Sequence, residues 1–342
     1  MKLSLHLVTW NGAKYIPMLF DSLKKQTFKD WKLVILDNAS SDNTVEKIKT
    51  ELQDFPFEHE LIINGENKGF AGGHTQLYKS CTSNYFLIIN QDLYLEGDCI
   101  EKMVKFMDEN FGVAAVSPRL MRWDFSADID DADKLKQGFT DQIDSLGLHL
   151  FRNRRVVESH TGEFWSTYKL TNLQTYTPEV FGVSGAIVLF RKKAIDEIGF
   201  LDESFQSYKE DVDLAFRLNS AGWKSAVLYG AVAYHDRSAA GPKEHGDRSA
   251  IENKKKQSEL VKYHSYKNHL MTLYKNEYWQ NFLLDFPWIL WYELKKLVYF
   301  ILFDRKVLKG LMEIWRLRKA LRDKRYEIRD RRKIGWREIR KI

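Results

Sequence analysis

Several ionisable side chains lie close together in the stretch YKEDVDLAFRLNSAGW, residues 208–223. If this stretch is a helix, Asp213 and Arg217 are one turn apart and predict an ordinary exposed ion pair on a face shared with Glu210. Asp211 belongs to neither that face nor the apolar one when the helix begins here. It could therefore project into a pocket as a general base that removes a proton from an attacking hydroxyl. The alternative is an acidic first turn that only complements the helix dipole.

Two further candidates, Asp92 and His235, each follow an apolar run. In IINQDLYL, residues 88–95, Asp92 is the single carboxylate and Asn90 precedes it by two positions. In LYGAVAYHDRS, His235 ends a short alternating strand that follows the acidic helix. From there the imidazole could return to the same cavity, where it would be a good ligand for divalent manganese or zinc. The alternative is a histidine with a structural purpose only.

Another carboxylate, Asp37, ends an apolar run in VILDNASSDNTVEKI. A carboxylate at the carboxyl end of an apolar strand has little structural purpose there, but it can accept the N–H of a pyrimidine or other base. Asp42 and Asn43, which follow it, are typical of a capped helix start, because Asn43 and Glu46 have the spacing of a capping pair.

The stretch NGENKGFAGGHTQLY places Gly69, Gly72 and Gly73 just ahead of a helical segment, with Asn67 before them. Glycines let a ligand approach the backbone closely, and the N-terminus of the following helix favours phosphate. The spacing matches neither a Walker loop nor a Rossmann fingerprint, so a tight connection is the alternative.

The hydrophobic pattern indicates the elements that must position these residues. Up to about residue 118, apolar strand-like runs alternate with amphipathic helical stretches, which predicts an α/β fold with a mainly parallel sheet flanked by helices. Ligands in open α/β sheets bind at the carboxyl ends of the strands, so the loops there should carry the chemistry. Residues 119–180 lack periodicity and are expected to form an irregular insertion. Order resumes over 181–236, and 247–342 is expected to be almost wholly helical.

The chain of 342 residues is 44% hydrophobic and can bury a substantial core. Its charge of +6 comes from residues 316–342, where 13 Lys/Arg face 4 Asp/Glu, a local +9 that leaves the remainder with −3. Basicity is thus a property of the tail. Cys81 and Cys99 have no CxxC spacing, which favours a reducing compartment and provides no zinc framework. No apolar stretch follows a basic start, so no secretory signal is evident and a cytoplasmic location is expected.

The order of the motifs TWN, LDNASSDNT, NKGFAGG, NQD, VSGA, GFLDESF and EDVDLAFRLNSAGW, with a trailing histidine, resembles the family 2 glycosyltransferases. The likeness is greatest to the bacterial rhamnosyltransferase-like branch and covers roughly residues 3 to 240. It implies a GT-A fold, whose Rossmann-like sheet binds a nucleotide-activated sugar with a divalent metal, usually Mn²⁺ or Mg²⁺. It also implies transfer of the sugar with inversion.

The resemblance implies roles for individual residues. Asp211 becomes the catalytic base, Asp92 the metal carboxylate and His235 a further metal ligand, while Asp37 becomes a contact for the nucleotide base. Asn90 stands where many family members have an acid. The metal shell is therefore expected to be one carboxylate, one imidazole, two diphosphate oxygens and water, with Asn90 binding the nucleotide-sugar. The other residues placed around the nucleotide-sugar are Thr9, Asn11, Asn67, Gly69, Gly72, Gly73, Gln91, Ser184 and Gly185.

The acceptor side of the site is expected to include Asp202, Glu203 and Glu210. For Asp202 and Glu203, capping or loop salt bridges are the alternative. Trp10 and Trp223 are expected in the core rather than as stacking platforms for a ligand.

Residues 282–303, FLLDFPWILWYELKKLVYFILF, are rich in aromatics but interrupted by charges and a proline. A spanning helix needs about 20 mostly apolar residues, which this segment does not supply unbroken. An interfacial helix pair is expected instead, with residues 282–342 held on an anionic membrane surface through aromatics and the basic tail. The alternative is a helical cap packed on the catalytic domain. Nucleic-acid binding is not expected, because acids alternate with the basic residues and no nucleic-acid motif accompanies them.

Two domains are therefore expected, a catalytic domain over 1–246 and a helical, membrane-peripheral extension over 247–342. The expected function is an inverting, metal-dependent glycosyltransferase at the inner face of a bacterial membrane. It would transfer a sugar from a donor such as dTDP-rhamnose or a UDP-sugar to a polysaccharide or lipid-linked glycan. A nucleotidyltransferase is a rival, but the N-terminal glycine- and Arg/Lys-rich loop expected of one is absent. The other alternative is a non-catalytic glycan- or membrane-binding scaffold with a decayed nucleotide site, which Asn90 favours.

Overall fold

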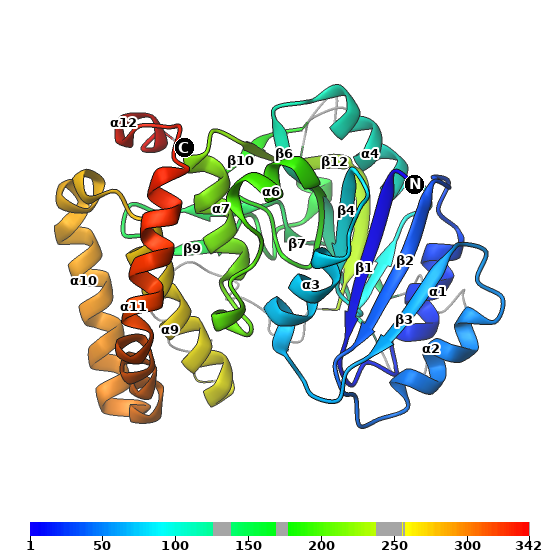
Figure 1. The fold of residues 1–342 in the computed structure, drawn as a ribbon, viewed down its shortest axis with the longest axis horizontal. Coiled ribbons are helices and arrows are strands. Elements are labelled where there is room, and N and C mark those ends of the chain that lie inside the picture. The colour runs from blue at the N-terminus through cyan, green and yellow to red at the C-terminus, as the bar shows by residue number, and fades with distance from the viewer. Residues whose placement is uncertain (126–137, 169–176, 237–254, 256, 342) are drawn as a thin grey trace.

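The fold is taken from a computed structural model, which describes residues 1–125, 138–168, 177–236, 255 and 257–341. A central sheet runs through the molecule and helices cover both of its faces (Figure 1). Among the described residues, ten strands form this sheet. They are β1 (Leu3–Thr9), β2 (Trp31–Asp37), β3 (His59–Ile63), β4 (Tyr85–Ile89), β5 (Leu93–Leu95), β6 (Val113–Trp123), β7 (Phe139–Ser145), β10 (Glu179–Val180), β11 (Ile187–Arg191) and β12 (Lys224–His235).

The strand order is β10-β12-β6-β11-β4-β1-β2-β3, with β5 paired to β12 and β7 to β6. Strands β3, β2, β1 and β4 run parallel, as do β6 and β12, whereas β11 lies antiparallel between β4 and β6. The prediction of a mainly parallel sheet is confirmed. Because Thr9 of β1 is in register with Asp37 of β2, the carboxyl ends of these strands meet at one edge.

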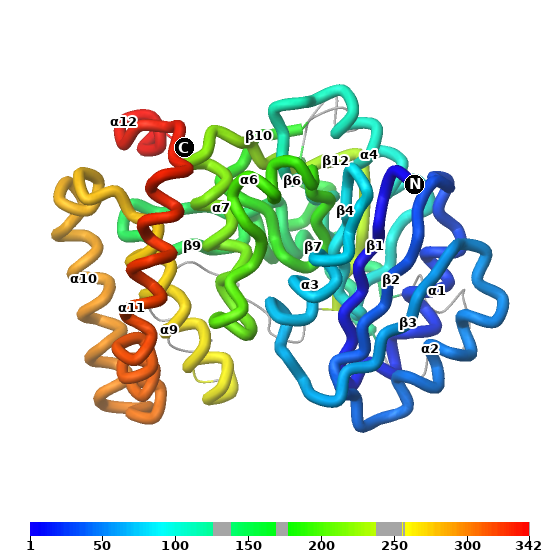
Figure 2. Tube along the Cα trace, viewed as in Figure 1, coloured from blue at the N-terminus to red at the C-terminus, as the bar shows by residue number. Residues whose placement is uncertain are grey.

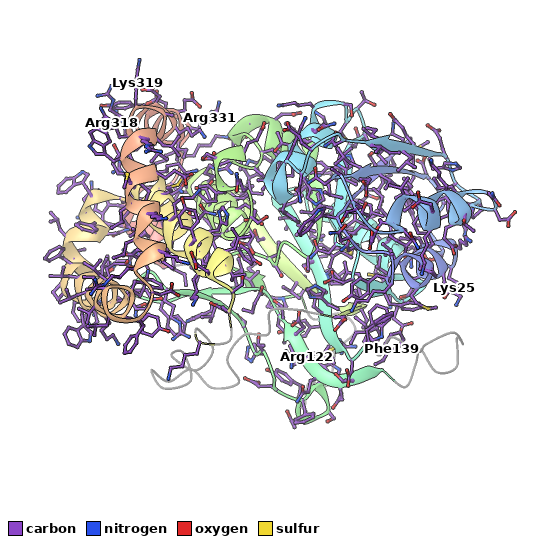
Figure 3. The ribbon with its side chains drawn as sticks, turned by 90° about the horizontal axis from the view of Figure 1, so that it is seen from below. Lys25, Arg122, Phe139, Arg318, Lys319 and Arg331 are labelled. Atoms are coloured by element: carbon purple, nitrogen blue, oxygen red, sulfur yellow. The ribbon has the colours of Figure 1, made fainter. Side chains whose placement is uncertain are left out.

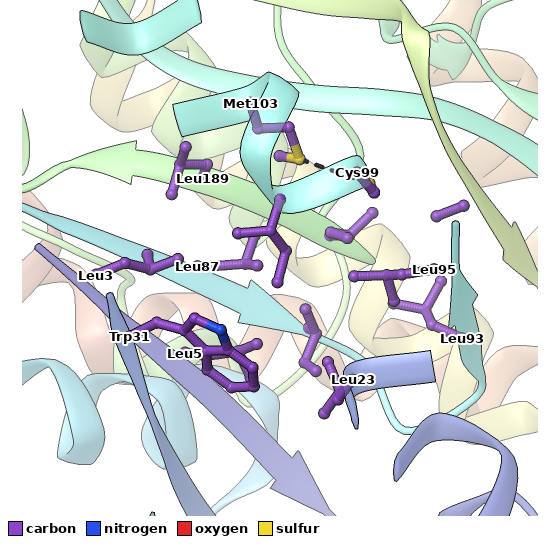
Figure 4. Close-up of a cluster of buried hydrophobic side chains, with 14 of the residues drawn as sticks. Leu3, Leu5, Leu23, Trp31, Leu87, Leu93, Leu95, Cys99, Met103 and Leu189 are labelled. Atoms are coloured by element: carbon purple, nitrogen blue, oxygen red, sulfur yellow. Dashed lines mark hydrogen bonds between the residues drawn. The ribbon is translucent and has the colours of Figure 1, made fainter. Parts of the chain in front are cut away.

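The sheet is held by an apolar layer on each face. Leu3, Leu5 and Leu7 of β1 alternate with polar residues and point toward the same side as Leu87 and Leu189, where Figure 4 shows the buried cluster. Three helices cover this face, namely α1 (Ile16–Lys24), α2 (Thr44–Leu52) and α4 (Cys99–Glu109). The opposite face is covered by α3 (Gly69–Lys79), α6 (Lys192–Ile198) and α7 (Glu210–Ser220).

The described residues beyond 258 are almost wholly helical, which confirms the prediction for this part of 247–342, whereas residues 247–254 and 256 lie outside the described residues. The main elements are α9 (Glu259–Asn276), α10 (Trp279–Phe303), α11 (Lys309–Asp330) and α12 (Trp336–Ile339). Figures 1 and 2 show α9, α10 and α11 side by side at the end of the molecule opposite α1 and α2. Of these helices, α9 packs against α7. In Figure 3, Arg318, Lys319 and Arg331 lie across the molecule from Phe139.

The expectation of an irregular segment over 119–180 is wrong for its described residues. Strand β6 continues to Trp123, β7 pairs back onto it, and a small hairpin follows from β8 (Leu148–Leu150) and β9 (Val156–Glu158). Register shifts between β6 and β7 disturb the regular alternation of side chains, which explains why the sequence showed no period here.

Candidate active site

Asp92, Asp211 and His235 line one cavity of about 420 Å³, although they are far apart in the sequence. Asp92 follows β4 at the carboxyl edge of the sheet, Asp211 stands in the first turn of α7, and His235 ends β12. The described lining also includes Asn90, Leu148, Val156, Glu158, Ser184, Gly185, Tyr208, Lys209, Glu210, Gln257, Val261 and Ser265. The wall therefore combines the sheet edge, the β8–β9 hairpin, the start of α7 and one side of α9.

His235 lies between two carboxylates. Its Nε2 is 3.4 Å from Oδ1 of Asp92, because β5 and β12 pair antiparallel with Leu93 opposite His235. On its other side, Nδ1 donates a hydrogen bond of 2.9 Å to Oδ2 of Asp144, which is fully buried. Burial alone would lower the pKa of His235, but the charge of Asp92 and the hydrogen bond to Asp144 raise it to about 10.

These groups fit a divalent cation, even though no group of three or more His, Cys, Asp or Glu side chains in the described parts of the chain is arranged to hold one. Asp144 binds Nδ1 of His235 and so leaves Nε2 directed toward Asp92, the arrangement that orients metal-binding histidines in proteins. The raised pKa of His235 reflects a negative potential at the same place. A carboxylate and an imidazole are suitable ligands for Mn²⁺, with the other positions left to oxygens of a substrate. Asp144 was missed because it lies in the segment expected to be irregular, where no motif marks it.

The carboxylate of Asp211 faces the cavity and is bound by backbone groups. Its oxygens accept hydrogen bonds from the backbone N–H groups of Val212 (2.7 Å) and Gly185 (3.4 Å). Burial and the charge of Glu158 raise the pKa of Asp211, while Lys209 opposes them. A carboxylate with a raised pKa, at a pocket wall and with an oxygen close to a glycine backbone, is suited to accept a proton.

The two acids beside Asp211 have different surroundings. Glu210 lines the cavity, and its Oε2 has no hydrogen-bond partner among the described residues. Burial and the charge of Asp211 raise the pKa of Glu210 to about 8. Asp213 instead pairs with Arg217 (3.0 Å) and Lys275 (2.9 Å) and is fully buried. The prediction of an exposed Asp213–Arg217 pair is therefore wrong, because α9 covers this face of α7.

Glu158, at the end of β9, was not predicted from the sequence. Its Oε1 accepts a hydrogen bond of 3.0 Å from the hydroxyl of Ser184, and both residues line the cavity beside Asp211. Ser184 was expected to let the donor sugar approach the backbone, and the structure adds a carboxylate beside it. The glutamate lies in a short strand of the same segment as Asp144, so again no motif pointed to it.

The structure does not bring Asp202 or Glu203 to the cavity. Asp202 is buried and pairs with Lys275 (2.6 Å) and Lys324 (2.5 Å) of the C-terminal helices. Burial would raise its pKa, but the two ammonium groups hold it well below the usual range. Glu203 is exposed and pairs with Lys79 (3.0 Å). The salt-bridge alternative therefore describes both residues.

The expected nucleotide end lies at the adjoining strand ends. Asp37 is buried at the end of β2, and its oxygens accept hydrogen bonds from the Thr9 hydroxyl (3.1 Å) and from the backbone and hydroxyl of Ser40 (2.9 and 2.6 Å). Asn11 has a positive φ of 49° and accepts a 2.8 Å bond from the backbone N–H of Ser41. These bonds tie the loops after β1 and β2 together and fix the direction of the Asp37 carboxylate.

The glycine loop is closely packed. Gly69 begins α3 with φ +72°, and a Cβ on Gly73 would meet Val8 at 2.8 Å, so both positions require glycine. Asn38, which the sequence did not single out, accepts a bond from the Lys68 N–H (3.1 Å) and donates one to the carbonyl of Gly69 (3.0 Å). The Asn67 side chain accepts a bond from the Gly69 N–H (2.8 Å). Gly72 lies in the same first turn, next to the side chain of Lys68.

Asn90 and Gln91 diverge although they are neighbours. Asn90 lines the cavity, whereas the Gln91 amide bonds the backbone N–H and carbonyl of Trp10 at 3.0 and 3.1 Å. The Trp10 side chain itself is 53% exposed, so its expected place in the core is wrong. Trp223 is half-buried against the apolar layer beneath α6 and α7.

Residues 4–199 match the family described as glycosyl transferase family 2. This match spans more than half of the chain. The chain belongs to glycosyl transferase family 2. It is thus a glycosyltransferase, and the resemblance drawn from the motifs is confirmed.

Two curated proteins are similar to the chain. The N-acetylglucosaminyl-diphospho-decaprenol L-rhamnosyltransferase of Mycobacterium tuberculosis is 23% identical over 250 residues, covering 67% of this chain and 74% of the relative. The O-antigen chain rhamnosyltransferase RfbN of Salmonella typhimurium is 22% identical over 244 residues, covering 69% of this chain and 66% of the relative.

Solved structures show the same fold. The mannosyltransferase PcManGT from Pyrobaculum calidifontis, in complex with GDP-Man and Mn²⁺, has a TM-score of 0.52 at 14% identity, covering 96% of this chain and 85% of that one. The crystal structure of GalNAc-T7 with UDP, GalNAc and Mn²⁺ has a TM-score of 0.57 at 12% identity, covering 80% of this chain and 48% of that one. The predicted GT-A fold is confirmed.

Proposed function

We propose that the chain is an inverting, metal-dependent glycosyltransferase that moves a sugar from a nucleoside-diphosphate donor to a hydroxyl of a glycan. The observation that carries this proposal is the convergence of Asp92, His235 and Asp211 on one cavity at the carboxyl edge of the sheet. Asp92 and His235 are suited to bind a cation, and Asp211 is suited to accept a proton. Neighbours of the same fold that are described with Mn²⁺ support a divalent cation, for which Mn²⁺ and Mg²⁺ are the candidates.

Asp92 and His235 are the protein groups that would hold the cation. When bound, it would neutralise the negative charge that develops on the departing nucleoside diphosphate. Asp144 keeps Nδ1 of His235 occupied, so Nε2 remains available on the cavity side. Asn90, on the same wall, offers an amide to the donor rather than a second charge.

Asp211 is the proposed base. It accepts the proton of the acceptor hydroxyl as the hydroxyl oxygen forms its bond to the anomeric carbon. The bond between that carbon and the diphosphate oxygen breaks on the opposite face, and its electron pair leaves with the diphosphate. A single displacement inverts the anomeric configuration and needs no second carboxylate as nucleophile. The hydrogen bond from the Gly185 N–H holds one oxygen of Asp211 at the cavity wall.

The donor would lie across the strand ends, with its nucleoside near Thr9, Asn11 and Asp37. The N-terminus of α3 at Gly69 would favour the negative charge of a nearby phosphate through the helix dipole. The relatives named rhamnosyltransferases make dTDP-rhamnose a candidate donor, and UDP-sugars are the other candidate. Ser184 and Gly185 line the cavity where the donor sugar would approach the backbone.

We also propose that the chain acts at the inner face of the cell membrane on a lipid-linked or cell-surface glycan. Among the described residues, no helix combines the length and apolar character needed to cross a bilayer. The support for peripheral attachment is the orientation of α10. Its buried face holds Asn281, Asp285 and Lys296 together with Ile289 and Phe300, while most of its apolar side chains are exposed. The exposed ones are Trp279, Phe282, Leu283, Leu284, Phe286, Trp288, Leu290, Trp291, Leu294, Val298, Ile301, Leu302 and Phe303.

Two charged residues of α10, Asp285 and Lys296, are thus buried on its inner face. Asp285 is buried and binds Arg152, Arg154 and Arg340, so an acid that interrupts the apolar run does not interrupt the exposed face. On the outer side, Lys295 lies 5.9 Å from the ring of Trp291. An apolar face bordered by cations is suited to an anionic lipid surface, with indoles at the headgroup level.

Thermal unfolding with UDP, dTDP and GDP, each with and without Mn²⁺, tests the donor site. The enzyme should gain stability from one nucleotide, and the gain should depend on the metal, because both bind the folded state. A screen of sugar nucleotides for hydrolysis without acceptor then identifies the sugar. No metal-dependent gain with any nucleotide would instead favour a scaffold whose nucleotide site has decayed.

A further inference from the structure

The segment just before Asp211 has a strained backbone. Gln206, Tyr208 and Lys209 are not glycines, yet their φ angles are 61°, 72° and 72°. L residues rarely adopt such angles, and they do so only when the surrounding structure holds them there. This segment ends at the first turn of α7, so its conformation determines where the carboxylate of Asp211 lies.

Asn268 of α9 holds this segment from one side. It is fully buried, and its side-chain nitrogen contacts the carbonyl oxygens of Phe205 (2.9 Å), Ser207 (2.9 Å) and Tyr208 (2.7 Å). Three backbone acceptors around one nitrogen identify it as the amide donor. An asparagine 57 positions after Asp211 thereby satisfies the carbonyls of the strained turn.

The glycine loop holds the same segment from the other side. The backbone N–H of Ala71 donates a 2.9 Å bond to the carbonyl of Gln206, and a Cβ on Gly69 would lie 2.7 Å from that oxygen. Phe70, in the same turn of α3, donates its N–H to the Ser207 hydroxyl at 3.4 Å. Residues 205–208 are therefore hydrogen-bonded on one side to the glycine loop at the start of α3 and on the other side to α9.

We propose that Asn268 is a positioning residue for Asp211, which makes α9 part of the catalytic unit rather than an appendage to it. The inference rests on the proposed role of Asp211 as the base. Without the amide, the carbonyls of Phe205, Ser207 and Tyr208 lose this donor, the strained turn relaxes, and Asp211 moves relative to the cavity. Val261 and Ser265 of the same helix line that cavity. Helix α9 therefore forms one wall of the site and also positions the proposed base, Asp211.

The decisive variant is Asn268→Asp in the full chain, with Asn268→Ala as a second. Aspartate has the same shape but cannot donate, and it places an anionic oxygen beside three carbonyls. Thr272→Val is the matched control, because Thr272 is buried one turn later in α9 and its hydroxyl has no partner within the part of the chain that the structure describes. Glu313→Gln is a second control, since it loosens the contact of α9 with α11 through Tyr263 and Lys267.

Two measurements are made on each variant. The first is transfer kinetics, in which the Asn268 variants should lose about 10- to 100-fold in kcat with donor KM nearly unchanged, because the reacting groups are misplaced while the donor still binds. The second is amide hydrogen exchange, which should accelerate over residues 206–211 in the Asn268 variants and stay at the wild-type rate in both controls.

The outcomes separate this inference from the proposed function. Faster exchange over residues 206–211 with unchanged kcat would overturn the positioning role of Asn268, and so would unchanged exchange. An equal kcat loss in Thr272→Val would attribute the effect to general packing and overturn it as well. A wild-type chain without transfer activity contradicts the function proposed for Asp211, whereas exchange still decides whether Asn268 holds the turn.

Discussion

The Nδ1 atom of His235 lies 2.9 Å from a carboxylate oxygen of Asp144, a residue 91 positions earlier in the chain. Asp144 is fully excluded from solvent, so this carboxylate does not bind a substrate directly. It orients the imidazole instead, and it fixes which ring nitrogen faces Asp92. The proposed metal site therefore depends on a strand, β7, that contains none of the sequence motifs by which the chain resembles the family.

Asp144→Asn should weaken Mn²⁺-dependent donor binding by about 10- to 100-fold, the range seen when the hydrogen-bond partner of a metal ligand is lost. Calorimetric titration of Mn²⁺ in the presence of saturating nucleoside diphosphate measures it. Asp141→Asn is the matched control, because Asp141 is an exposed acid of the same strand. Equal affinities for the Asp144 variant and the wild type would remove Asp144 from the account of the site.

Asp211→Asn should leave the affinity for nucleotide unchanged and reduce kcat by about 10²- to 10⁴-fold, because amides do not accept the proton that the acceptor releases. Asp92→Ala and His235→Ala should instead weaken metal-dependent donor binding first. Glu203→Gln is the control, since Glu203 is an exposed acid outside the cavity. Near-normal turnover of Asp211→Asn would show that another group is the base.

The pH dependence of transfer follows from the surroundings of Asp211. Burial and the charge of Glu158 raise its pKa, so the deprotonated base is lost as pH falls through a value above the usual aspartate range. Glu158→Gln removes that charge, lowers the pKa of Asp211 and should shift the acid limb of kcat/KM to lower pH. The hydrogen bond from Ser184 can remain, because a glutamine oxygen also accepts it. If the acid limb of the kcat/KM profile stayed at the same pH in Glu158→Gln, the electrostatic coupling between Glu158 and Asp211 would be contradicted.

The local sequence pattern predicted the features that depend on neighbouring residues in the chain. The parallel sheet followed from apolar runs, and the separation of Asp211 from the Asp213 face followed from helical spacing. What it missed depends on distant partners: Asp144 meets His235 from 91 residues away, and α9 buries the Asp213–Arg217 pair that looked exposed. Short strands with shifted register, such as β7, also lack a period that sequence reasoning could detect.

Lys275 should be required for stability rather than for donor binding. It is buried and pairs with both Asp202 (2.6 Å) and Asp213 (2.9 Å), so Lys275→Met leaves two buried carboxylates with one partner fewer. Loss of a buried partner costs about 3–5 kcal/mol, which urea unfolding would measure. Lys324→Met is the control, because this partner of Asp202 is more exposed and its loss should cost less. Equal stabilities of wild type and Lys275→Met would contradict the prediction.

The pairs of Asp202 also predict sensitivity to acid. Its folded pKa lies below the ordinary value, so the stability that it contributes is complete above that value and is lost as pH falls toward the folded pKa. Lys275→Met should therefore have a smaller loss of stability between neutral pH and the acid range than the wild type. Unfolding at a series of pH values compares the two slopes, and parallel slopes would exclude Asp202 as the cause.

Membrane attachment can be tested on the exposed face of α10. Replacing Trp291 and Leu302 by glutamate should reduce sedimentation with vesicles that contain anionic lipid, since both side chains are largely exposed and a charge there opposes insertion. High salt should reduce binding of the wild type too, because it screens the basic residues of α11 and the tail. Phe111→Glu is the matched control, an exposed aromatic on the catalytic half. If sedimentation stays the same while light scattering shows a dimer dissociating into monomers, a second copy of the chain covers this face instead of lipid.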